Sequence, residues 1–199
     1  MDEQREVFFK STEDLRQKIY QKRLALESEF AKKNPDAKNA ANLQKEISDL
    51  RAQIDQKRIA HLIEMKKINP GFGAGFMGPG RMGHGYGRGY RGNGHMMGYG
   101  PYGYGNLSPQ DTAKLEQSQQ KFLNDTSDLR NSIQEKQFAL NKEIQQTNPD
   151  RDKITNLQKE LSQLEAQFDQ KALEHRLDLR KNFPDNALSM GYGRGGYCW

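Results

Sequence analysis

The sequence predicts an all-α protein built from two antiparallel hairpins of long helices, and three observations carry this prediction. The chain repeats itself at a spacing of 114 residues without a gap, with about 28 identities over the 63 positions from Phe8 to Pro70. All 19 glycines lie in two segments, 71–105 and 191–196. The rest of the chain is rich in Lys, Glu, Gln, Leu and Ala, which are strong helix formers. A tandem duplication of one helical unit follows.

The first unit is predicted to hold helices over 2–33 and 37–68. Asn34-Pro35-Asp36 separates them, because proline disfavours helical geometry in the residue before it and Asp36 can cap the next helix. Apolar residues of the second helix step by four and three, which places them on one face. This stripe consists of Leu43, Ile47, Leu50 and Ile54. Arms of about 30 residues are roughly 45 Å long.

The second unit repeats this arrangement. Ser108 can cap a helix whose first position is Pro109, which predicts a helix over 109–147. Asn148-Pro149-Asp150 predicts the turn before a helix over 151–182. The equivalent stripe consists of Leu157, Leu161, Leu164 and Phe168.

Four segments are therefore expected along the chain. They are a first hairpin over 1–68, a linker rich in Gly, Tyr, Arg, His and Met over 69–105, a second hairpin over 106–183, and a Gly-rich tail over 184–199 that ends in Cys198-Trp199. We expect disorder over about 70–105 and 186–199, where glycine is concentrated.

The formal net charge of +5 is unevenly distributed. Residues 1–68 carry 15 basic and 12 acidic side chains, and residues 106–182 carry 12 and 13. The linker holds Arg81, Arg88 and Arg91 and no acid. No segment approaches the roughly 18 consecutive apolar residues of a membrane helix, so no span is expected.

The first hairpin is expected to be truncated at its N-terminus. The second unit opens with Leu107-Ser108-Pro109-Gln110, whose first residue stands eight positions before the equivalent of Met1. The first unit lacks such an opening, and the charged start Met1-Asp2-Glu3-Gln4-Arg5 is unlike a signal peptide. We infer that the chain begins inside its first helix and that an upstream signal peptide is missing from this sequence.

Several short motifs carry a resemblance to a known family. They are the opening Leu107-Ser108-Pro109-Gln110, the turn Asn34-Pro35-Asp36 with its copy, and the endings Gly94-His95-Met96-Met97-Gly98 and Tyr197-Cys198-Trp199. In this order they resemble the Spy/CpxP family of periplasmic stress chaperones, whose units open with a Leu-Thr-x-x-Gln motif, and most of all its zinc resistance-associated (ZraP) and heavy-metal sensor branch. The resemblance implies a bacterial envelope protein that binds metal, acts as a holdase for unfolded client proteins, or does both. Asp111 departs from the motif, which prefers Gln there, and two fused units are unusual for this family.

Candidate metal ligands lie in the glycine-rich segments. His84 and His95 stand among Met82, Met96 and Met97, and Cys198 is the only cysteine. Imidazole and thiolate suit Zn²⁺, whereas thioether with thiolate suits Cu(I). None of these residues has zinc-finger spacing, so a solvated linker with incidental His and Met is the alternative, and Cys198 could instead form an intermolecular disulfide. The resemblance favours zinc bound through His84, His95 and Cys198, with the methionines as further candidates.

Two other histidines occupy equivalent helical positions. His61 and Met65 stand four residues apart on one helical face, and the pair resembles part of the site in CnrX-type nickel and cobalt sensors of the same superfamily. The copy has His175 but Leu179 in place of Met65, and the first helix offers no histidine. Half-buried, hydrogen-bonded histidines are therefore the favoured interpretation, and a metal site the less favoured one.

Two further function classes are disfavoured. The run from Gly85 to Gly92 spaces Arg and Tyr by glycine, as in RNA-binding glycine-rich segments. The helices add little positive charge and no RNA-recognition motif is present, so nucleic-acid binding is a remote alternative. The sequence has no phosphate-binding loop and no Ser/His/Asp constellation, and paired amphipathic helices offer surface rather than a pocket, so an enzyme is not expected.

Two hypotheses of function remain from the sequence. One is a holdase chaperone and the other is a metal sensor, which could regulate a sensor kinase. In both, we expect the two units to pair within the chain as a pseudo-dimer, or to form a homo-oligomer. The linker of about 37 residues has a typical reach of roughly 30–36 Å, which keeps the two hairpins close to each other.

Overall fold

The computed structural model describes residues 2–69 and 108–183, and all secondary structure within these two ranges is helical. The helices are α1 (Asp2–Ala31), α2 (Ala37–Ile68), α3 (Pro109–Asp125), α4 (Ser127–Gln145) and α5 (Arg151–Asn182). The all-α fold is confirmed, and α2 and α5 have the predicted bounds. The segments expected to be disordered, 70–105 and 186–199, lie outside the described residues.

Both hairpin turns are capped as the sequence predicts. The carboxylate of Asp36 accepts hydrogen bonds from the backbone nitrogens of Lys38 and Asn39 at 2.9 and 3.2 Å. The carboxylate of Asp150 does the same for Asp152 and Lys153 at 3.0 and 3.1 Å. These side chains satisfy amide donors that have no partner inside the helix.

The helix predicted over 109–147 is two helices, which corrects the prediction. α3 ends at Asp125 and α4 begins at Ser127, with Thr126 between them at φ −112° and ψ 1°. The Thr126 hydroxyl donates to the carbonyl of Phe122 at 2.7 Å, and the Arg130 guanidinium donates to the carbonyl of Leu123 at 2.6 Å. Side-chain bonds of this kind compete with the regular helical ladder and bend the helix.

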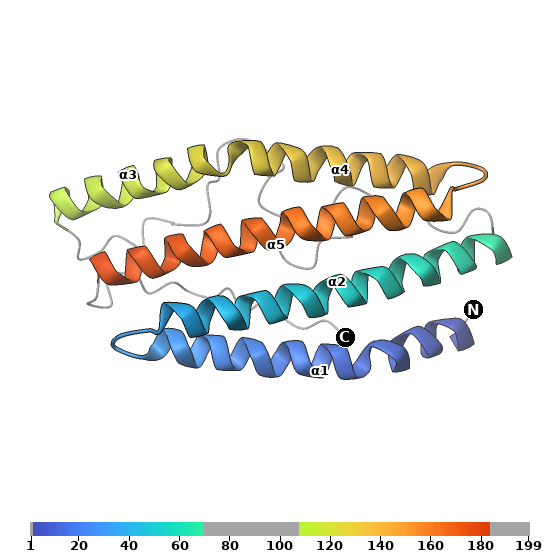
Figure 1. Cartoon of the computed structure of the whole chain (residues 1–199), viewed down its shortest axis with the longest axis horizontal. Coiled ribbons are helices and arrows are strands. Elements are labelled where there is room, and N and C mark those ends of the chain that lie inside the picture. The colour runs from blue at the N-terminus through green and yellow to red at the C-terminus, as the bar shows by residue number, and fades with distance from the viewer. Residues whose placement is uncertain (1, 70–107, 184–199) are drawn as a thin grey trace.

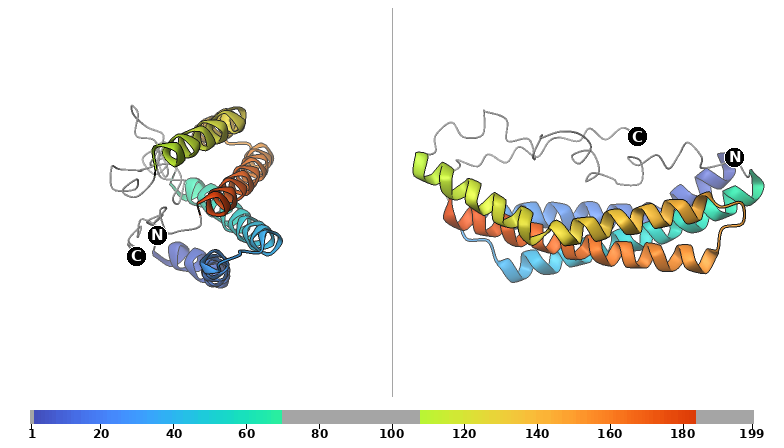
Figure 2. Two further views of the ribbon diagram at one scale, coloured as in Figure 1. Left: turned by 90° about the vertical axis from the view of Figure 1, so that its left-hand side faces the viewer. Right: turned by 90° about the horizontal axis from the view of Figure 1, so that it is seen from above.

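The helices form one open, curved layer rather than a closed bundle (Figures 1 and 2). α1 packs on α2, α2 on α5, and α5 on α4, so α1 and α4 lie at the two edges. α3 continues the line of α4 beyond the kink and also contacts α5. The two hairpins therefore meet through α2 and α5, which run antiparallel to each other (Figure 1).

Two hydrophobic clusters hold the layer together, and each contains residues of both hairpins. One consists of Ile59, Leu62, Ile63, Leu140, Ile144, Ile154 and Leu161. The other consists of Ile19, Leu26, Phe30, Ala40, Ile47 and Leu173. From the predicted stripes, Ile47, Leu161 and Phe168 are buried. Leu43, Leu50 and Ile54 are half-buried against the second cluster, and Leu157 is half-buried against the first.

The contact between the hairpins has an approximate twofold character. Lys66 in the last turn of α2 donates to the backbone carbonyls of Ile144 and Gln146, at the end of α4. Its repeat equivalent Arg180, in the last turn of α5, donates to the carbonyl of Lys32 at 3.3 Å, just beyond the end of α1. Each hairpin thus supplies a basic side chain to the carbonyl-rich end of the other hairpin's first arm, where the helix dipole favours positive charge.

Candidate functional site

The family-motif residues that the structure describes act as a helix start. The Ser108 hydroxyl accepts from the backbone nitrogen of Asp111 at 3.1 Å, and Pro109 and Gln110 are the first two residues of α3. The same hydroxyl donates to the Asp111 carboxylate at 2.8 Å, and this bond, with Lys114 nearby, lowers the pKa of Asp111. Leu107 lies outside the described residues.

The candidate metal ligands of the glycine-rich segments also lie outside the described residues. They are Met82, His84, His95, Met96, Met97 and Cys198. Their prediction therefore stays a prediction.

His61 is packed as a half-buried side chain. Its ring stacks on that of Phe8 in α1, with centroids 5.1 Å apart and an interplanar angle of 19°. Burial lowers the pKa of His61, which favours the neutral imidazole. Met65 is 3% exposed and belongs to the packed side of α2.

His175 has the same surroundings in the second hairpin. Its ring stacks on Phe122, with centroids 4.6 Å apart and an interplanar angle of 8°, and its Nδ1 lies 3.5 Å from the Ser118 hydroxyl. Burial lowers the pKa of His175, and Asp178 opposes this shift. Phe8 and Phe122 are repeat equivalents, so the aromatic–histidine stack is a duplicated packing element.

The described residues do not fit a metal ion. Nowhere in ranges 2–69 and 108–183 do three His, Cys, Asp or Glu side chains gather in a geometry that could hold one. The interpretation of His61 and His175 as half-buried histidines agrees with their placement. Neither His61 nor His175 belongs to a group of three such side chains in the described ranges, and their less favoured metal role stays a prediction.

Sequence reasoning missed a buried carboxylate at each hairpin turn. Glu29 accepts from the Lys32 ammonium at 2.7 Å, from the backbone nitrogen of Asp36 at 2.8 Å and from the Asn39 amide at 2.7 Å. The Lys32 bond, then the bonds from Asp36 and Asn39, lower the pKa of Glu29 to about 2. Its side chain is 3% exposed.

Glu143 takes the same place in the second hairpin. It accepts from the backbone nitrogen of Asp150 at 3.2 Å and pairs with Lys153 at 2.7 Å. The signal that could have revealed both carboxylates is their recurrence seven residues before Asp36 and Asp150.

A polar cluster crosses the contact between the hairpins. The buried carboxylate of Asp169 in α5 pairs with Arg51 in α2 at 2.8 Å. It also accepts from Gln44 at 3.1 Å and from the Ser48 hydroxyl at 3.3 Å. Burial raises the pKa of Asp169, and Arg51, Ser48 and Arg23 oppose that shift. This cluster fixes the register of α2 against α5.

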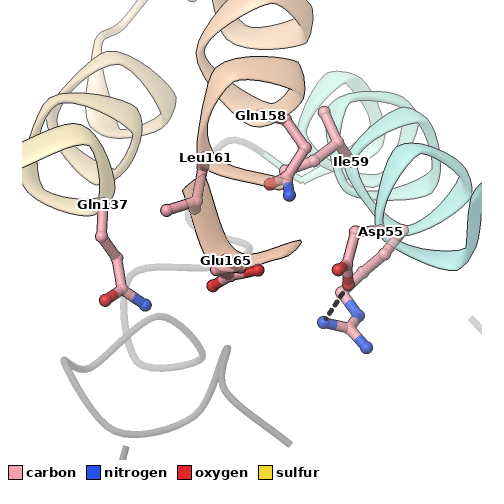
Figure 3. Close-up of a pocket in the computed structure, with 7 residues that line it drawn as sticks. Asp55, Ile59, Gln137, Gln158, Leu161 and Glu165 are labelled. Atoms are coloured by element: carbon pink, nitrogen blue, oxygen red, sulfur yellow. Dashed lines mark ion pairs between the residues drawn. The ribbon is translucent and has the colours of Figure 1, made fainter. Parts of the chain in front are cut away.

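A small polar cavity lies next to this cluster. It holds about 20 Å³, which is room for one water molecule. Three helices supply its walls, with Asp55 from α2 and Glu165 from α5 on two sides and Gln137 from α4 on a third (Figure 3). The remaining lining residues are Arg58, Ile59, Gln158 and Leu161. Arg58 pairs with Asp55 at 2.9 Å.

Large apolar side chains stand exposed on the edge helices. Tyr20 and Leu24 of α1 are 53% and 47% exposed, and Phe138 of α4 is 71% exposed. Leu24 and Phe138 are repeat equivalents, so both edges carry an apolar group at the same position. Further along α1, Phe9 is 45% exposed, with the guanidinium of Arg16 at 5.2 Å from its ring centroid.

Comparison with known proteins identifies the family. A family model described as heavy-metal resistance matches the chain in two stretches, residues 1–70 and 71–186. The chain belongs to the heavy-metal resistance family. Searches of curated proteins and of solved structures gave no match. At the level of the family, this agrees with the resemblance to the Spy/CpxP group.

Most of the candidate metal ligands lie inside the stretches that match the heavy-metal resistance family. The second matched stretch includes Met82, His84, His95, Met96 and Met97, whereas Cys198 lies beyond it. Within the part of the chain that the structure describes, no helix is long and apolar enough to cross a membrane.

Proposed function

We propose that this protein is a periplasmic, zinc-binding stress protein that holds unfolding envelope proteins and has no catalytic role. The observation that carries the proposal is the exposure of large apolar side chains at equivalent places on both edge helices, Leu24 on α1 and Phe138 on α4. On α1, Tyr20 and Leu24 stand one helical turn apart, so their exposed side chains are neighbours on one face, and adjoining exposed apolar groups mark a surface that can bind an apolar partner. Unfolding proteins expose apolar segments that can serve as this partner.

The open layer suits this role. A single layer of helices leaves more apolar surface accessible than a closed bundle does. Arg5 and Arg16 lie over the exposed ring of Phe9 at 5.6 and 5.2 Å from its centroid. Guanidinium groups beside aromatic rings give mixed apolar and cationic contacts, which suit clients of varied sequence.

The metal part of the proposal rests on the family and on residue chemistry. The family is one of heavy-metal resistance, and the described helices offer no metal site. The ligands we propose are His84, His95 and Cys198, with Met82, Met96 and Met97 as added ligands if the metal is copper. When bound, the metal would supply a crosslink between the Gly-rich segments and thereby change assembly or the exposure of the helices.

The test is suppression of the thermal aggregation of a client protein, with and without Zn²⁺. We expect suppression by the native chain, and a roughly 30-fold higher concentration requirement for the Leu24→Ser, Phe138→Ser double variant, because two apolar contacts worth about 1 kcal/mol each are lost. Gln134→Ser on the exposed face of α4 is the matched control and should retain full activity.

The metal arm uses a variant with His84→Ala, His95→Ala and Cys198→Ser. We expect this variant to hold clients without Zn²⁺ and to lose the response to Zn²⁺. Zinc binding without suppression under any condition would contradict the holdase and favour the second candidate, a heavy-metal sensor that regulates a signalling partner such as a sensor kinase.

A further inference from the structure

Among the positions at which the two repeats differ along the contact between the hairpins, one exchanges a basic residue for an acidic one. Arg51 in α2 and Glu165 in α5 are repeat equivalents, and both lie beside this contact. Arg51 faces the buried carboxylate of Asp169 at 2.8 Å. Asp55, the equivalent of Asp169, lines the cavity together with Glu165 instead. A twofold contact of identical units would carry two such ion pairs between α2 and α5, whereas this chain carries one. On the other side, Asp55 pairs with Arg58 of its own helix and shares the cavity with Glu165.

Part of the surrounding polar scaffold is present on both sides of the contact. Gln44 donates to Ser48 at 3.4 Å on the Arg51 side, and Gln158 donates to Ser162 at 3.2 Å on the Glu165 side. The Gln–Ser pair is therefore kept on both sides, whereas the charged residues differ: Glu165 stands where the first repeat has Arg51, and Ala172 stands where it has Arg58.

The charged groups around Glu165 come from two helices. Asp55, Arg51 and Arg58 face it from α2, and Asp169 follows it by one helical turn along the same side of α5. α4 contributes the uncharged Gln137 (Figure 3). Desolvation, then Asp55 and Asp169, raise the pKa of Glu165 to about 7, and the two arginines oppose the shift. Glu165 is an exposed residue, so its proton exchanges with solvent and water screens part of its repulsion from Asp55.

We propose that Asp55 and Glu165 make the contact between α2 and α5 sensitive to pH. With Glu165 protonated, the cavity holds one charged carboxylate, that of Asp55, which Arg58 neutralises. α2 and α5 then remain packed against each other around the cavity. With Glu165 ionised, two carboxylates repel each other across the cavity and loosen it. The ion pair of Arg51 with Asp169 keeps α2 and α5 in contact on the neighbouring side of the cavity, so the helices pivot about this pair.

The direction of the effect follows from linkage. The unfolded chain releases the Glu165 proton near the ordinary glutamate pKa of 4.5, whereas the folded chain keeps it until about 7. The stabilisation is therefore complete below pH 4.5 and is lost as pH rises toward and through 7. The proton favours the closed contact.

The test measures thermal unfolding and amide exchange of the full chain between pH 4.5 and 8. We expect Glu165→Gln to unfold about 2–5 °C higher than the native chain at pH 8, with the difference vanishing near pH 4.5. The difference between variant and native curves is the relevant quantity, because burial also lowers the pKa values of His61 and His175 and their protonation contributes equally to both curves. Amides around Ile59 and Leu161 should exchange faster at pH 8 than at pH 5 in the native chain, and equally at both in the variant, once both rates are corrected for the intrinsic effect of pH on exchange.

Two further variants make the outcome decisive. Glu174→Gln, at an exposed position of the same helix, should leave the pH profile of the native chain unchanged. Glu165→Arg should recreate the ion pair seen at Arg51 and raise the unfolding midpoint at pH 8 at least as much as Gln does. A Glu165→Gln profile parallel to that of the native chain from pH 4.5 to 8 would overturn the proposal.

Discussion

At the scale of single residues, the most informative contacts occur in both repeats. A buried glutamate ties each hairpin turn, and each late histidine stacks on a phenylalanine of the preceding arm. Recurrence after 114 residues marks Glu29 and Glu143 as candidates, although exposed charges such as Asp14 and its equivalent Asp128 recur as well. In a helix full of Glu and Lys, nothing local distinguishes Glu29 from Glu27.

We predict that Glu29→Gln lowers the stability of the chain at neutral pH, because the ionised carboxylate accepts three hydrogen bonds and an amide cannot replace its charge. The pKa of Glu29 falls from 4.5 to about 2 on folding, so its contribution is complete above pH 4.5 and is lost as pH falls through 2. Unfolding midpoints at pH 7 and pH 2 should differ less for the variant than for the native chain.

Glu27→Gln is the matched control, since Glu27 is exposed on the same helix. Equal losses for the Glu27 and Glu29 variants at pH 7 would contradict the assigned role of Glu29.

At the scale of elements, the sequence predicted α2 and α5 to the residue because each is bounded by a proline-containing turn and an aspartate cap. It did not predict the break at Thr126, since threonine and arginine four residues apart are unremarkable in a helix. The first copy has the same pair: the Thr12 hydroxyl bonds the carbonyl of Phe8 at 3.0 Å, and Arg16 bonds that of Phe9 at 2.9 Å. There the helix stays continuous, so the pair bends a helix but does not by itself divide it.

We predict that Arg130→Met destabilises the chain by about 1 kcal/mol, because the guanidinium bonds to Leu123 and Thr126 are lost from a half-buried site. Denaturant unfolding measures this change. Arg151→Met, which removes an exposed side chain 3.7 Å from Glu64, should change stability by less than half as much. Equal effects of the two substitutions would refute the role of Arg130 at the kink.

At the scale of the whole molecule, the internal sequence repeat accounts for both the layer and its edges. Each hairpin presents one helix, α2 or α5, to the other hairpin, and leaves the first arm at an edge. The linker length predicted that the hairpins lie close, and the apolar stripes predicted which helices have a face to bury. Neither the linker length nor the apolar stripes predicted that α1 and α4 lie at opposite edges of the layer. Shape complementarity along the whole layer decides that, and a pattern of apolar positions does not encode it.

The pairing of both hairpins within one chain is the central claim, and chemical cross-linking of lysines tests it most directly. A mixture of unlabelled and heavy-nitrogen-labelled chains, diluted until monomeric, separates contacts within a chain from contacts between chains. We predict links within one chain from Lys32 to Lys181 and from Lys66 to Lys142, since Arg180 bonds Lys32 and Lys66 bonds Gln146. The link between Lys22 and Lys45 inside the first hairpin serves as the internal standard. Lysine links confined to each hairpin, or found only between labelled and unlabelled chains, would contradict the account.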